Sequence, residues 1–103
     1  MSPANEYRGE ASLEVGGETL VLRPSFSALV AAEQELGPLF ELVERASEGR
    51  LALHEIATLF DHLSVGRPPA ITRERIGEAV VEKGLAGIGP TLRLVLGQIL
   101  KGK

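Results

Sequence analysis

Two histidines, each beside an acidic residue, are the side chains of this sequence that most resemble a metal site or an acid–base pair. His54 precedes Glu55, and His62 follows Asp61. One zinc ion needs its nitrogen ligands about 2 Å away, whereas eight residues of a single helix separate the two imidazoles by about 12 Å. The spacing of two histidines around a glutamate in zinc peptidases is also absent. We therefore predict no metal ligand here and expect a solvated helix face.

The other motifs of enzyme chemistry are missing as well. No serine stands in a Gly-x-Ser-x-Gly turn, and the chain has no cysteine to serve as a nucleophile or thiolate ligand. Gly84, Gly87 and Gly89 lie close together, but without the spacing of a phosphate-binding loop. The sequence thus predicts no catalytic residue, no cofactor and no enzyme activity.

One carboxylate stands out among many that should be solvated. Glu33 falls between Val30 and Leu36, within the apolar stripe of a predicted helix. A carboxylate buried there needs hydrogen-bond donors. The free N–H groups of the helix that begins after Gly37-Pro38 could supply them, and Arg23 is an alternative partner. We predict that Glu33 is a structural clamp at a helix–helix corner, so that Glu33→Ala lowers the melting temperature more than Glu35→Ala.

The elements that position these residues begin with a β-hairpin over residues 8–22, after a lead-in at 1–6 that we expect to be disordered. Two short alternating runs flank Gly16-Gly17, a pair that suits a two-residue turn. The inward side chains are expected to be Ala11, Leu13, Val15, Leu20 and Leu22.

Residues 25–101 are predicted to be helical. Ser25 or Ser27 should cap the first helix and Gly37 should end it. A second helix follows from Pro38 to Gly49, a third from 52 to 65, and a fourth from Thr72 to Gly84. The apolar stripes expected to face the core comprise Phe26, Leu29, Val30 and Leu36; Leu39, Phe40, Leu42, Val43 and Ala46; Leu53, Ile56, Leu59, Phe60 and Leu63; and Ile76, Ala79 and Val80.

The last helix is predicted to have Pro90 in its first turn and to run to about Lys101. Its inner face should carry Leu92, Val95, Leu96, Ile99 and Leu100. Leu94 falls nearly opposite them, between Arg93 and Lys101. We take Arg93, Leu94 and Lys101 as candidate partner-binding residues at its outer face.

Taken together, the elements predict one α+β domain over residues 1–103, with an N-terminal β-hairpin followed by four or five short α-helices. Fourteen acids against seven arginines in residues 1–82 disfavour binding to nucleic acid. The segment in which basic residues are not balanced by acids lies after position 82. We also expect no membrane segment and a cytoplasmic location.

Several segments, in order, resemble a known family. They include the hairpin opening with Arg8-Gly9-Glu10, the segment from Leu22 to Leu29, Glu33 ahead of Leu36-Gly37, and Glu82-Lys83-Gly84 before an apolar C-terminal helix. Together they resemble the gene transfer agent family proteins that are grouped with phage tail assembly chaperones and are also labelled tail tube proteins. Ala52 departs from the pattern, where relatives often carry a capping Ser or Thr, and Pro90 interrupts a usually continuous helix.

The resemblance implies a non-enzymatic protein that binds the tape-measure protein while a phage-like tail or gene transfer agent particle assembles. The alternative that we keep is a structural subunit of a phage-like tail or tube, with tail tube protein as its partner. The oligomeric state and the binding face stay open at this point.

Overall fold

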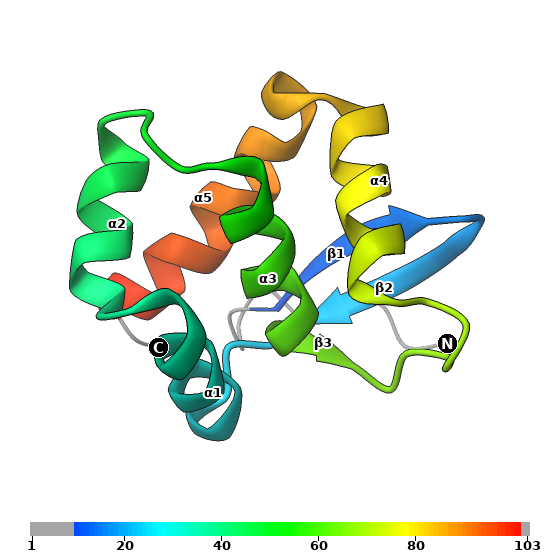
Figure 1. Ribbon diagram of the computed structural model, residues 1–103, viewed down its shortest axis with the longest axis horizontal. Coiled ribbons are helices and arrows are strands. Elements are labelled where there is room, and N and C mark those ends of the chain that lie inside the picture. The colour runs from blue at the N-terminus through cyan, green and yellow to red at the C-terminus, as the bar shows by residue number, and fades with distance from the viewer. Residues whose placement is uncertain (1–9, 102–103) are drawn as a thin grey trace.

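A computed structural model describes residues 10–101 of the 103-residue chain. The predicted disordered lead-in at 1–6 and the first two residues of the predicted hairpin lie outside these described residues. Two strands, β1 (Ala11–Val15) and β2 (Glu18–Leu22), come first. Five helices follow, with a short third strand between the third and fourth (Figure 1). The predicted α+β, mostly helical class is confirmed.

The hairpin forms as the sequence predicts. Gly16 and Gly17 both have positive φ, at 56° and 84°, which is the geometry of a tight type I′ turn. The register pairs Leu13 with Leu20 and Ala11 with Leu22. All five predicted inward side chains of the two strands are buried.

The helices α1 (Phe26–Leu36), α2 (Leu39–Ser47), α3 (Leu53–Leu63) and α4 (Arg73–Lys83) match the predicted elements closely. The Ser25 hydroxyl accepts from the Ala28 N–H, and the Thr72 hydroxyl from the Arg75 N–H, so both caps act where expected. Gly37 and Gly84 end their helices at φ values of 87° and 85°, which favour glycine.

A third strand was not predicted. Residues 64 and 65, expected to finish the third helix, instead form β3 (Ser64–Val65), which pairs antiparallel with β2. The Arg23 N–H also donates to the Leu63 carbonyl at 2.8 Å. The exposed N–H and C=O groups of the β2 edge attract this partner, whereas the apolar periodicity of residues 53–63 gave no sign of where the helix stops.

The last helix, α5 (Leu85–Lys101), begins earlier than predicted, so Pro90 lies beyond its first turn. Pro90 is the sixth residue of α5 and lacks the N–H that would bond to the residue 86 carbonyl, so the helix continues past it with one i→i−4 hydrogen bond fewer. Gly84 ends α4 and also starts α5, since its carbonyl accepts from the Ile88 N–H at 3.0 Å. Residues 85–89, which include Gly87 and Gly89, are therefore helical.

The core lies between the sheet and the helices that cover one of its faces. Phe60 of α3 is fully buried at its centre, together with side chains from β1, β2, α2, α4 and α5. Both α4 and α5 pack against β1, and α5 also contacts α2. These contacts place α2 and α5 side by side, with the C-terminal end of α5 near α1 (Figure 1).

Candidate binding groove

An apolar groove crosses the surface where α1, α2 and α5 meet. Its first part is a hollow of about 330 Å³ between the three helices. Two aromatic side chains that were predicted to face the core line this hollow instead: Phe26 is 85% exposed and Phe40 is 76% exposed. The prediction failed because α1 and α2 lie at the edge of the molecule, where their apolar stripes are wider than the face that the core covers.

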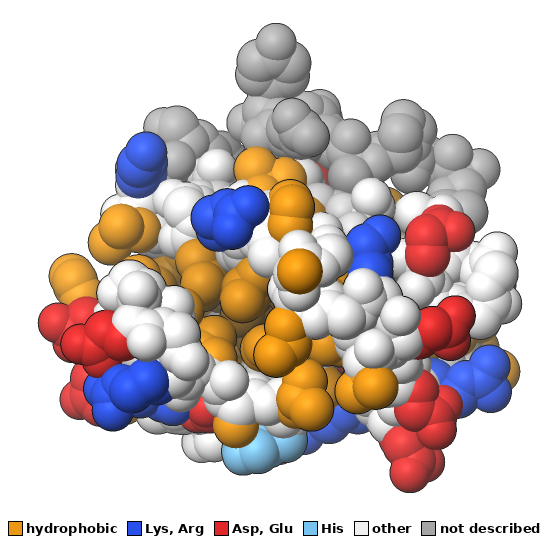
Figure 2. All heavy atoms as spheres, turned by 90° about the horizontal axis from the view of Figure 1, so that it is seen from above, with side chains coloured by type: hydrophobic (Ala, Val, Ile, Leu, Met, Phe, Trp, Pro, Cys, Tyr) orange, Lys and Arg blue, Asp and Glu red, His pale blue; other side chains and the backbone are white. Residues whose placement is uncertain are grey.

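The groove continues along α2 and α5. A second hollow, of about 530 Å³, shares Val43 and Leu100 with the first and is lined by the C-terminal half of α2 and by residues 89–100 of α5. Seen from above, hydrophobic side chains gather in a hollow beside α2 (Figure 2). Val43 is half-buried, and Leu100, which was predicted to be an inner residue, is exposed. We call the two hollows together the groove.

Two glycines of α5 line the groove, and neither has a side chain that projects into it. Gly97 lines the second hollow, and a Cβ atom added there would meet no atom within 4 Å. Gly89 lines the same hollow, and an added Cβ there would lie 3.3 Å from Arg93 Nη1. A partner backbone can therefore approach α5 closely at Gly97.

The predicted partner-binding residues are separated by the structure. Arg93 is exposed and lines the second hollow, and Lys101 is exposed but lines neither hollow. Leu94 is half-buried against the core, so it is not the exposed outer residue that the sequence suggested. Helix α5 is contacted by β1, α2 and α4, while Pro90 and Arg93 in its middle are exposed.

Glu33 lies at the α1 end of the groove. Its Oε2 accepts from the Leu39 N–H, at 3.1 Å, in the first turn of α2. Pro38 precedes this turn and offers no side-chain cap. Glu33 itself is exposed, in contrast to the burial we expected, and Arg23 pairs with Glu10 instead. The clamp role for Glu33 stays a prediction, and this contact supports it.

An ion-pair network joins α1, α3 and α4 away from the groove. Glu35 Oε1 lies 3.0 Å from Arg73 Nη2 and 2.8 Å from His62 Nε2. Arg73 also donates to Asp61 at 2.9 Å, and Asp61 accepts from Arg67. Hydrogen bonds from Arg73 and then from His62 lower the pKa of Glu35 to about 2. His62 was expected on a solvated face, but its side chain is only 20% exposed.

The side chain of Glu55 takes the place of a side-chain cap at the N-terminus of α3. Ala52 has no side chain that can accept a hydrogen bond, but Glu55 Oε1 accepts from the Ala52 N–H at 2.9 Å. Arg45 of α2 holds the same carboxylate through two bonds, of 2.8 and 2.6 Å. These contacts, with Arg45 the larger influence, lower the pKa of Glu55 to about 2.

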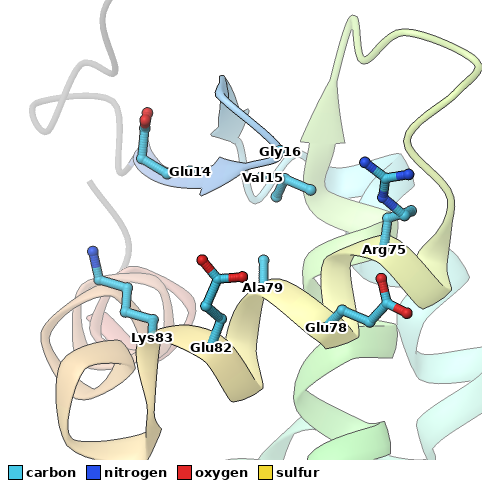
Figure 3. Close-up of a pocket in the computed structure, with 8 residues that line it drawn as sticks. All are labelled: Glu14, Val15, Gly16, Arg75, Glu78, Ala79, Glu82 and Lys83. Atoms are coloured by element: carbon cyan, nitrogen blue, oxygen red, sulfur yellow. The ribbon is translucent and has the colours of Figure 1, made fainter.

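A polar hollow of about 380 Å³ lies on another face, between α4 and the β1–β2 turn. Glu82 and Ala79 face β1, with Lys83 on one side and Arg75 on the other (Figure 3). Its acidic and basic side chains are mixed, so it has no single charge with which to select a ligand. Among residues 10–101, no three His, Asp or Glu side chains gather closely enough to hold a metal ion.

Comparison with known proteins gives one match. The sequence profile of a family described as "Phage tail tube protein, GTA-gp10" matches residues 8–102, nearly the whole chain. No curated protein and no solved structure matches the chain. Within residues 10–101, none of the helices has both the length and the apolar character that crossing a membrane requires.

Proposed function

Because the chain belongs to the phage tail tube protein family GTA-gp10, we propose that it is a non-enzymatic, chaperone-like tail assembly protein. Its partner in this proposal is the tape-measure protein, whose long amphipathic helices need shelter before the tail tube surrounds them. The family match supports a role in a phage-like tail. The tape-measure protein is the partner that the resemblance implies, and the groove supports a partner with an apolar helix.

The observation that carries the proposal is the exposure of Phe26 and Phe40 beside one apolar groove. Removing apolar surface from water is favourable by about 25 cal/mol per Å² before the costs of association are subtracted, and aromatic side chains commonly anchor protein interfaces. Singly exposed apolar residues are ordinary. Two phenylalanines and Leu100 around one hollow form a continuous apolar surface that fits the apolar face of a helix.

The dimensions of the groove fit a helix as well. One of its walls is α2, whose nine residues extend for about 13 Å. That length matches two to three turns of a bound helix, enough for anchors at positions i, i+3, i+4 and i+7. The open space beside Gly97 leaves room for the backbone of such a helix.

The test is co-expression with the tape-measure protein from the same genome, followed by a solubility assay and a pull-down. We expect the tape-measure protein to become soluble and to co-purify. Phe40→Ser should reduce co-purification strongly. Val81→Ser is the matched control, because Val81 is also exposed, at 62%, but lies on α4 outside the groove. Equal effects of the two substitutions would refute the groove as the binding site.

A second variant fills the groove without removing any contact. Gly97→Leu places a side chain where an added Cβ meets no atom, and leucine favours a helix over glycine. We expect a protein at least as stable as the natural one that no longer retains the tape-measure protein. A stable variant with unchanged binding would also refute the proposal.

A structural tail or tube subunit is the second candidate, and the description of the matching family favours it. This function predicts that the purified protein forms rings or tubes, whereas a chaperone stays small. Size-exclusion chromatography with light scattering, followed by electron microscopy of any large fraction, separates the two. Assembly with tail tube subunits in place of the tape-measure protein would favour the subunit.

A further inference from the structure

The two ends of the groove carry opposite charges. Glu33 lines the hollow at the α1 end, and Arg93 lines the hollow at the other end, beside Gly89. Both side chains are exposed. Within the described part of the chain, no ion pair joins either of them to another charged side chain. Oε2 of Glu33 accepts from the Leu39 N–H, so the other carboxylate oxygen of Glu33 and the guanidinium of Arg93 are available to a partner in the groove.

The other charged residues of α2 and α5 do not line the groove. Glu41 and Glu44 are absent from both hollows, and Arg45 is held by Glu55. Lys101 follows Leu100 in the chain but also lines neither hollow. Glu33 and Arg93 are thus the two full charges that meet the apolar surface.

We propose that this pair of charges sets the direction of the bound helix, an inference that rests on the proposed function. A helix that carries a basic side chain over Glu33 and an acidic side chain over Arg93 is favoured. Helices commonly have acids in the first turn and bases in the last turn, which complement the helix dipole. Such a helix lies with its N-terminus at Arg93 and its C-terminus at Glu33, parallel to α5 and antiparallel to α2.

The experiment uses the full chain and cross-linking. The chain contains no cysteine, so Val30→Cys at the Glu33 end and Ser47→Cys at the Arg93 end each give one reactive thiol. The probe is a synthetic peptide of the tape-measure segment that the complex protects from proteolysis, with one terminal cysteine. A second peptide has the charged residues of its two ends exchanged. A short bismaleimide joins the thiols.

The cysteine is at the acidic end of the first peptide and at the same terminus of the second, and we expect that of the first peptide to cross-link Ser47→Cys over Val30→Cys by about fivefold, as two exposed charge pairs would give. Exchanging the peptide charges should reverse this pattern. Arg93→Glu in the protein should remove the preference, and Lys101→Gln should leave it unchanged. Cross-links at both ends in equal yield, or a pattern that ignores the exchanged charges, would overturn the inference while the groove remains the binding site. No cross-link at either position would overturn the proposed function too.

Discussion

Glu35 of α1 and Arg73 of α4 are 38 positions apart in the chain, and two N–H···O contacts join their side chains. Arg73 reaches across to Asp61 of α3 at the same time. One guanidinium therefore fastens three helices at a single point. Arginine suits this role because its planar group offers five donors in a fixed geometry.

The first prediction follows from that contact. Glu35→Ala should lower the melting temperature at least as much as Glu33→Ala, because it leaves Arg73 and His62 without their shared acceptor. The sequence alone predicts the opposite order of the two melting temperatures, because it places Glu35 on a solvated helix face. Gln34→Ala, at the exposed position between them, is the control. A melting temperature for Glu35→Ala equal to that of the control would contradict the structure.

The second prediction concerns pH. The pKa values of Glu35 and Glu55 are lowered from 4.5 to about 2 in the folded chain. The stability that each carboxylate contributes is fully present above pH 4.5 and is lost as the pH falls toward 2. Chemical denaturation between pH 6 and pH 2.5 measures it. The Glu35→Gln, Glu55→Gln double variant should lose less stability over this interval, and high salt should narrow the difference.

The third prediction is that Ala52→Ser stabilises the protein by about 0.5 to 1 kcal/mol. Ala52 has the extended backbone of an N-cap, with φ −79° and ψ 155°. A serine there would accept from the Glu55 N–H while Glu55 continues to accept from residue 52, which completes a capping box. Urea denaturation is the measurement. Ala70→Ser, at an exposed turn position, should have no comparable effect.

The fourth prediction tests Glu33 as a clamp. Glu33→Ala removes the acceptor of the Leu39 N–H, and losing a helix cap of this kind costs about 1 kcal/mol. The loss should appear in urea denaturation and should exceed that of Gln34→Ala. If the two variants unfold at the same urea concentration, the Leu39 contact contributes nothing measurable and Glu33 is an ordinary surface residue.

The fifth prediction is that Gly97→Ala raises the free energy of unfolding by about 1 kcal/mol, as expected for replacing glycine inside a helix. Gly97 has a negative φ, and an added methyl group there has open space. Gly84→Ala is the contrasting variant, because its φ of 85° strains any other residue. It should lower stability.

Much of the fold could be predicted from the sequence because its local signals are strong. The Gly16-Gly17 turn, the cap residues Ser25 and Thr72, and the period of α3 each specify a structure within a few residues of the chain. β3 could not be predicted in this way, because residues 64 and 65 pair with β2 more than forty positions earlier and carry no strand pattern of their own.

The groove was predicted less well. A periodic stripe shows which side chains share a helix face, but not how much of that face another element covers. Phe26 and Phe40 follow the period and are nevertheless exposed, while Leu94 breaks it and is half-buried. Arg93 is exposed, and its role in binding stays a prediction; its place in the groove depends on α2, which only the tertiary fold brings beside α5.

The way the sheet is completed has a consequence for how the chain folds. β1 and β2 are made before the helices, yet their third strand lies at 64–65, and the helices that cover β1 are α4 and α5. The apolar side of the hairpin therefore stays exposed until α4 and α5 have been synthesised. Pairings between distant segments slow folding, so the rate-limiting step should be the docking of these late helices onto an early and unstable hairpin.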